Sequence, residues 1–356
     1  MVERAAVVAL AVALGCAPSL PARYAEARAA AERAYASGRY DEAATHWQRA
    51  HDEAERPRDQ ADALYRRAAS LRRSGRSALA RAVLDDLVRQ HPRSHRADRA
   101  HYDRCDLVIE SGAASEGFDC LTQLVKARPR SPLALHAADR SLRHVEHSQG
   151  AQAALGWAVA LEPAVRGTAV DEQLRFRRAE LLERAGRPAE ARAVYRDTAR
   201  AFPYPIGAYW DDALIRAARI DVGLGRLGDA LDATNILLAE RETSHLQGSY
   251  DKPAFAEARL LRASIYEQQG QPERAVAELR RLFHEHPHSL LRDDALWREA
   301  RLAGSMGDQR RACSALGLLR RELPDSRFAP CAQLLCSALG PLEGRSCRDY
   351  VARELK

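Results

Sequence analysis

Apolar residues recur along this chain at helical spacing, in successive stretches that are separated by a glycine or a proline, as in residues 62–71 (DALYRRAASL). Eight glycines each follow one such stretch and precede another: Gly38, Gly75, Gly112, Gly150, Gly186, Gly225, Gly270 and Gly307. Successive glycines are 37, 37, 38, 36, 39, 45 and 37 residues apart. Because a regular period of this length indicates a repeat architecture, the pattern predicts an all-α protein of about eight helical hairpins.

Each repeat has the same internal order. The glycine supplies the left-handed residue that ends the first helix. Five positions later comes a small residue, and four positions after that comes a large apolar residue. Together they let the second helix pack closely against the first. The small residues are Ala43, Ala80, Ala191, Ala230, Ala275 and Ala312, and the large ones are Trp47, Leu84, Leu121, Tyr195, Leu279 and Leu316. A proline, which cannot continue a helix, closes five of the repeats at Pro92, Pro129, Pro203, Pro287 and Pro324.

This order resembles the tetratricopeptide repeat, which has a period of about 34 residues. The additional residues lie in junctions such as 91–100 (HPRSHRADRA) and 286–296 (HPHSLLRDDAL). These junctions resemble the repeats of BamD-type outer-membrane assembly lipoproteins and of Tol-associated periplasmic coordinator proteins. The resemblance covers residues 24–340. It implies a right-handed α-solenoid in the cell envelope that binds a protein partner.

Two irregularities suggest how the array is divided. Residues 241–253 (RETSHLQGSYDKP) form an insertion after the sixth repeat, and the degenerate fourth repeat is followed by a loose segment from Pro163 to Thr168. We therefore predict repeats 1–4 over residues 24–165, repeats 5–8 over 166–325 and capping helices over 326–356. The last of these helices is expected from Leu342 to Lys356, since a solenoid needs a polar cap at its end.

The N-terminus reads as an export signal. Residues 5–14 (AAVVALAVAL) form an apolar run that is too short to span a bilayer but is typical of a signal peptide. The following Ala13-Leu14-Gly15-Cys16 resembles a bacterial lipobox, although Ala13 stands where leucine is usual. The resemblance implies a signal peptide over 1–15, lipidation at Cys16, a tether over 16–23 and, with Ala17 next, the outer membrane. An ordinary cleaved signal, or a buried helix with an incidental cysteine, are the alternatives.

Six further cysteines agree with export, because an even number in an oxidising compartment allows up to three disulfides. Cys105 and Cys120 fall on the two helices of one predicted hairpin and are a plausible pair. The connectivity of Cys313, Cys331, Cys336 and Cys347 stays open at this stage.

Charge adds little to this interpretation. The formal net charge is +6, and the 55 basic residues include only three lysines. The arginines alternate with acidic residues along the predicted helices, which indicates solvated helix surfaces and not a nucleic-acid site.

The sequence predicts neither an enzyme nor a cofactor. It contains no glycine-rich phosphate loop and no zinc-protease or serine-hydrolase motif. His284, His286 and His288 crowd one helix end, but their spacing matches no zinc pattern. We therefore expect no small-molecule substrate and no metal.

Instead, a stack of hairpins offers a concave groove lined by the first helices. Equivalent turns of these helices carry Tyr65, Tyr102, Phe176, Ile215, Leu260 and Trp297, bordered by Arg72, Arg73, Glu183, Arg219 and Arg301. Such a ladder suits a bound peptide, and the alternative is that these residues pack between neighbouring hairpins. The predicted function is a periplasmic scaffold that binds an envelope-assembly protein; a subunit of an anti-sigma-type sensor, or an accessory to a peptidoglycan or polysaccharide enzyme, are the rivals.

Overall fold

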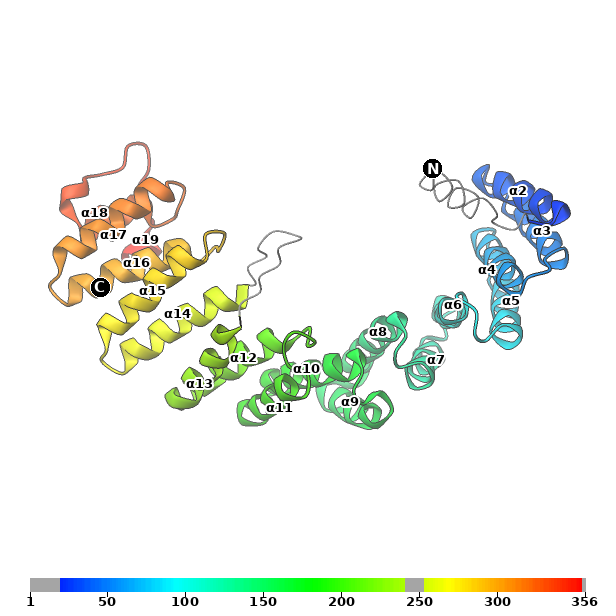
Figure 1. Cartoon of the computed structure of the whole chain (residues 1–356), viewed down its shortest axis with the longest axis horizontal. Helices are drawn as coiled ribbons and strands as arrows, with labels where there is room; N and C mark the ends of the chain where they lie inside the picture. Colours follow the sequence, from blue (N-terminus) through cyan, green and yellow to red (C-terminus); the bar gives the residue numbers. More distant parts are fainter. Residues whose placement is uncertain (1–19, 241–252, 354–356) are drawn as a thin grey trace, which may run out of the picture. The chain divides into compact units, whose positions relative to one another are not determined.

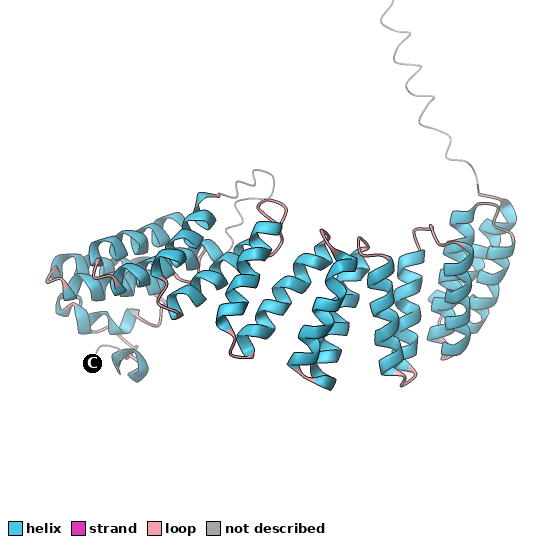
Figure 2. Ribbon diagram, turned by 90° about the horizontal axis from the view of Figure 1, so that it is seen from below, coloured by secondary structure: helices cyan, strands magenta, loops and turns pink. Residues whose placement is uncertain are grey.

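The computed structural model of the protein describes residues 20–240 and 253–353, and every regular element in these ranges is a helix (Figure 2). The predicted all-α architecture is therefore confirmed. The helices are α2 (Ala22–Ala36), α3 (Tyr40–Asp52), α4 (Pro57–Arg73), α5 (Ser77–Gln90), α6 (Ala97–Glu110), α7 (Ala114–Ala127), α8 (Pro132–Gln149), α9 (Ala151–Val165), α10 (Ala169–Arg184), α11 (Pro188–Ala201), α12 (Trp210–Gly223), α13 (Leu227–Ala239), α14 (Pro253–Gln268), α15 (Pro272–Glu285), α16 (Arg292–Ser305), α17 (Gln309–Glu322), α18 (Ala332–Leu335) and α19 (Asp349–Arg353), with the short 3-10 helices Ala329–Cys331 and Ser337–Leu339.

Consecutive helices pair as hairpins (Figure 1). The chain divides into two compact units, Met1–Asp171 and Glu172–Lys356, with the boundary inside α10. Unit 1 contains the hairpins from α2 to α9. Unit 2 contains most of α10 and every helix that follows it. The sequence predicted a division at residues 165 and 166, six residues earlier.

The glycine turns form as predicted. All eight glycines have φ between 68° and 92°, a region in which any side chain would be strained. At Gly75, for example, the backbone N–H of Arg76 donates to the carbonyl of Leu71 at 2.8 Å, which satisfies an end of α4. The turn is thus a local property of each repeat.

The predicted small and large residues meet in the core. The six alanines are completely buried, and so are Trp47, Leu84 and their four equivalents. In the third repeat the small position is Gly117, five residues after Gly112, and it is buried against Ile109 of the first helix.

Proline closes the second helices as expected. Helices α5, α7, α11, α15 and α17 each end two residues before their proline. Pro163 differs, because α9 continues through it to Val165. It lies in the last turn and on the exposed side of that helix, where the loss of one backbone donor is tolerated.

The C-terminal cap differs from the prediction of one helix from Leu342. Helix α19 begins only at Asp349, and residues 340–348 form turns and irregular backbone. Pro341 and Gly344 disfavour a helix there, and a disulfide ties Cys347 to Cys331. The cap packs through Phe328, Ala332 and Val351 onto the core of the last hairpin.

The predicted signal peptide (1–15), the lipidation residue Cys16, most of the tether (16–23) and nearly all of the insertion (241–253) lie outside the described residues. Among the helices that the structure describes, none combines the length and apolarity needed to span a bilayer.

Candidate protein-binding surface

In unit 1, three successive first helices together line one hollow of about 360 Å³. We call this the unit 1 hollow. It is lined by Tyr35 of α2, by Tyr65, Ala68, Ala69, Arg72 and Arg73 of α4, by Leu84 of α5, and by Arg99, Asp103 and Leu107 of α6. It therefore spans three repeats along the face on which the sequence placed a groove.

The floor of the unit 1 hollow is apolar. Ala68, Leu84 and Leu107 are almost completely buried in the core of the second hairpin. Tyr35 stands at one wall with 37% of its surface exposed, and its ring meets the edge of Tyr40 at a centroid distance of 5.2 Å. Because tyrosine offers a large apolar surface with a polar tip, such a wall suits a partner side chain.

Polar groups join the helices across the hollow. The Tyr65 hydroxyl donates to the Asp103 carboxylate at 2.9 Å, and Arg99 donates to the same carboxylate at 2.9 Å. Burial and the nearby Asp103 charge raise the pKa of Tyr65 above its ordinary value. Asp103 is therefore occupied within the protein and holds α4 and α6 together.

The arginines at the rim differ in their partners. Arg72 forms an ion pair with Glu110 of α6. Arg73 is exposed and lies over the ring of Tyr40 at 5.6 Å, and no acidic side chain in the described ranges pairs with it. Arg73 is thus a cation at the hollow that remains available to an anionic group.

The predicted ladder is divided by the structure. Tyr65, Arg72 and Arg73 line the hollow, but Tyr102 is buried and its hydroxyl accepts a hydrogen bond from Arg140 at 2.7 Å. Tyr102 therefore links α6 to α8 and does not line the hollow.

In unit 2 the ladder residues are mainly core. Phe176, Ile215 and Trp297 are each less than 5% exposed. Phe176 stacks on Tyr209 at 4.6 Å, and Trp297 stacks on Phe328 at 5.0 Å. The structure thus places these three side chains in the core and not on a groove surface, and Phe176 and Trp297 pack on residues that follow their own hairpins.

The remaining predicted residues lie nearer the surface. Leu260 is half-buried against the core of the α14–α15 hairpin. Arg219 is exposed and pairs with Glu257, Glu183 accepts hydrogen bonds from Tyr195 and Arg216, and Arg301 is exposed.

The sequence missed Tyr35, Arg99 and Asp103 as parts of the site. A pattern that points to Asp103 is the spacing of 38 residues between hydrogen-bonded partners on successive first helices. Tyr65 with Asp103, Arg72 with Glu110 and Tyr102 with Arg140 all have it.

Two family models match the chain, and both describe a tetratricopeptide repeat. One covers residues 62–94, and the other covers residues 140–204 and 215–289. These segments of the chain are therefore tetratricopeptide repeats. Proteins with these repeats are scaffolds that bind protein partners, and no enzyme family is indicated for this chain.

The chain is also similar to several solved structures, at low sequence identity and low TM-score. PilF of Pseudomonas aeruginosa is 12% identical with a TM-score of 0.37, covering 66% of this chain and 96% of its own. The type IV pilus biogenesis factor PilW is 16% identical with a TM-score of 0.32, covering 76% and 96%. The C-terminal part of a repeat protein from Cytophaga hutchinsonii is 12% identical with a TM-score of 0.39, covering 85% and 97%. At such scores the likeness says nothing of partners, and no curated protein matches the chain.

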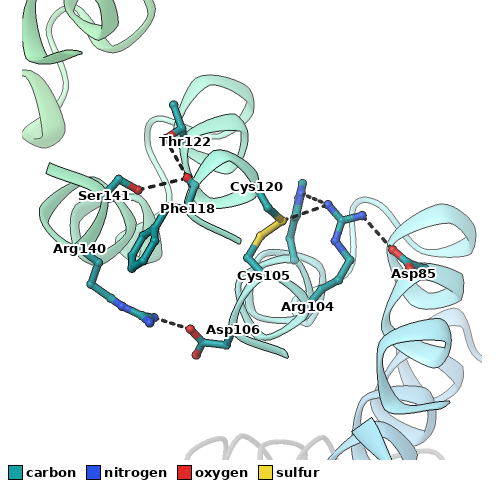
Figure 3. The surroundings of a disulfide bond; sticks show 10 residues. Asp85, Arg104, Cys105, Asp106, Phe118, Cys120, Thr122, Arg140 and Ser141 are labelled. Carbon is teal, nitrogen blue, oxygen red and sulfur yellow. Dashed lines mark hydrogen bonds and ion pairs between the residues drawn. A yellow bond between two sulfur atoms is a disulfide. The ribbon is translucent and has the colours of Figure 1, made fainter. Parts of the chain in front are cut away.

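The six cysteines of the repeat body form three disulfides: Cys105–Cys120, Cys313–Cys336 and Cys331–Cys347. The first joins α6 to α7, and Figure 3 shows Arg104 beside it, donating to Asp85 at 2.8 Å. His101 lies close enough to Cys105 and Cys120 to suggest a metal site among the described residues. The two sulfurs are bonded to each other, however, so neither is a thiolate that could hold a metal.

Proposed function

We propose that this protein is an outer-membrane lipoprotein that faces the periplasm and binds an envelope-assembly protein through the unit 1 hollow. The observation that carries the binding proposal is the composition of this hollow. Its apolar floor and exposed Tyr35 offer area to a partner side chain, and Arg73 offers an unpaired charge beside them. A few aromatic and arginine residues around a desolvated centre commonly carry most of the energy of a protein interface.

The anchor and the location have separate support. The apolar run 5–14 followed by Cys16 resembles a lipobox, and the three disulfides are of a kind that persists in an oxidising compartment such as the periplasm. Stable anchoring needs more than one acyl chain, and a lipidated N-terminal cysteine supplies that.

The anchor is tested by Cys16→Ser in the full-length chain. We expect the substitution to abolish labelling with palmitate and to release the protein from the membrane fraction. Unchanged labelling and fractionation would show that Cys16 is not the anchor.

The binding site is tested in intact cells with a photo-crosslinking amino acid. Benzoylphenylalanine in place of Tyr35 should give a covalent adduct with one envelope protein, which mass spectrometry then identifies. The same amino acid in place of Leu79, an exposed residue on α5 outside the hollow, is the matched control and should not give this adduct.

Two further substitutions distinguish specific capture from random contact. Ala69→Leu places bulk inside the hollow, and Arg73→Ala removes its unpaired charge, so each should reduce the Tyr35 adduct at least severalfold without loss of helicity by circular dichroism. An adduct that persists at full yield in both variants would contradict the proposed site.

A further inference from the structure

A second surface of unit 1 lies where the first three repeats meet at their junctions. Two adjacent hollows of about 860 Å³ and 560 Å³ share Arg58 and His95. The larger one is lined by the start of α4 and by the turn between α5 and α6, residues 91–95, and the smaller one by the starts of α2 and α4. We call them the basic hollows.

Arginine dominates the charge of the basic hollows. Five arginines line them, Arg28, Arg56, Arg58, Arg93 and Arg96, against two aspartates, Asp59 and Asp62. Arg56 pairs with Asp59 at 2.6 Å and Arg96 pairs with Asp62, so the aspartates are neutralised within the site. Arg28 pairs with Glu32 of its own helix.

The two remaining arginines have no acidic partner. Arg58 and Arg93 are exposed, and neither forms an ion pair with any described residue. They line the larger hollow from different repeats. Because like charges facing one hollow repel each other, their placement favours an anionic occupant.

Hydrogen-bonding groups in the same hollow are also unused. The Nε2 atom of His91 and the hydroxyl of Ser94 are shielded from solvent and lack a hydrogen-bond partner. Buried polar atoms are normally paired. Both residues line the larger hollow, which therefore carries polar side chains beside the two arginines.

The position of the basic hollows in the chain indicates where that anion comes from. Leu20, the first described residue, lines the smaller hollow, and it follows Cys16 by four residues. Four residues span at most about 14 Å. If Cys16 carries the acyl chains, the basic hollows lie near the bilayer surface, where basic groups attract anionic headgroups.

We infer that the basic hollows bind the phosphate headgroups of anionic phospholipids in the membrane to which the protein is anchored. The inference rests on the proposed lipidation for its geometry. Contact with headgroups adds a second attachment beside the acyl chains and so restricts the orientation of unit 1 at the membrane. The unit 1 hollow, which shares no lining residue with the basic hollows, stays free for a protein partner.

The experiment uses the chain from residue 16 onward with Cys16→Ser, which keeps every described helix and carries no acyl group. Its partition is measured by flotation on vesicles of pure phosphatidylcholine and on vesicles that contain phosphatidylglycerol. Because the acyl group is absent, this measurement is independent of the labelling test of Cys16, and either proposal can fail alone.

We expect binding to the phosphatidylglycerol vesicles only, weakening as salt is added. Arg58→Gln with Arg93→Gln should lower the partition coefficient about tenfold or more, since each basic group near an anionic surface contributes about a factor of five. The matched control is Arg81→Gln with Arg130→Gln, two exposed arginines of unit 1 outside the basic hollows, and it should change the coefficient less than twofold.

Three results would overturn the inference. These are equal binding to both kinds of vesicle, equal loss in the two double variants, and displacement by submillimolar inorganic phosphate at constant ionic strength. The last result would identify a site for a free anion and not for a membrane surface.

Discussion

At the scale of single residues, buried ion pairs between neighbouring repeats are the most consequential contacts. The carboxylate of Asp221 is completely buried and binds both Arg192 and Arg196 of α11. A buried charge is tolerated only when it is paired and hydrogen-bonded. Asp221 therefore ties α12 to the preceding repeat.

Asp221→Asn should lower the free energy of unfolding by about 3 kcal/mol or more, because Arg192 and Arg196 both lose a completely buried carboxylate partner. Chemical denaturation followed by circular dichroism measures it. Asp229→Asn is the matched control, since Asp229 also pairs with Arg192 but its side chain is 44% exposed, and it should cost less than about 1 kcal/mol. Equal costs would contradict the role of burial.

Asp62 of α4 gives a pH dependence. Burial alone would raise the pKa of Asp62, but the hydrogen bond and charge of Arg96, with the charge of Arg66, outweigh it and hold the pKa below its usual 3.8. A carboxylate with a lowered folded-state pKa contributes stability above its unfolded pKa and loses it as the pH falls through the folded pKa.

The difference in unfolding free energy between the wild type and Asp62→Asn should thus be constant above about pH 5 and shrink below pH 3.8. Urea titrations at a series of pH values measure it. Asp86→Asn, which removes a surface pair with Arg89 of the same helix, should cost less than about 1 kcal/mol. A difference for Asp62→Asn that grows as the pH falls would contradict the assigned pairing.

At the scale of elements, the close approach of two helices within a hairpin sets which residues are allowed. Gly117 of α7 occupies the small position of the third repeat. A Cβ atom there would lie 2.9 Å from the backbone nitrogen of Ile109 and 3.1 Å from the carbonyl oxygen of Cys105. Helix α6 leaves no room for even one methyl group.

Gly117→Ala should therefore destabilise the protein by about 1 to 3 kcal/mol, although alanine favours helices. Gly156→Ala in α9 is the control, because a Cβ atom there meets nothing within 4 Å, and it should stabilise by up to about 1 kcal/mol. Thermal unfolding of both variants checks the prediction, which fails if the two changes have the same sign.

At the scale of the whole molecule, stability is local, because each hairpin contacts chiefly its neighbours along the chain. Each disulfide lies within one of the two compact units. Cys105–Cys120 lies in unit 1, whereas Cys313–Cys336 and Cys331–Cys347 lie at the end of unit 2.

Cys105→Ser with Cys120→Ser should cost about 3 kcal/mol and should speed hydrogen exchange in α6 and α7 while α16 and α17 stay protected. Cys331→Ser with Cys347→Ser should instead speed exchange in α16 and α17 while α6 and α7 stay protected. Exchange measured by mass spectrometry distinguishes the segments. Equal acceleration throughout the chain in either variant would show that the molecule unfolds as a single unit.

The sequence by itself determined the repeat, since the glycine that ends the first helix and the proline that ends the second both act locally. A glycine with positive φ ends each first helix and a proline closes five second helices, and both effects depend on the backbone of a few residues. The buried small and large residues, such as Ala43 and Trp47, were likewise predicted from the sequence, because they pack within a single hairpin.

Only the tertiary structure decided which face of each first helix is free. Trp297 and Phe176 occupy turns that the sequence assigned to a groove, yet both are buried. Trp297 stacks on Phe328, and Phe176 stacks on Tyr209. The rotation of a helix about its axis depends on how successive hairpins pack, which the period of the sequence does not contain. The pairing of the four C-terminal cysteines also depends on tertiary structure, because it is set by where the cap folds back on the last hairpin.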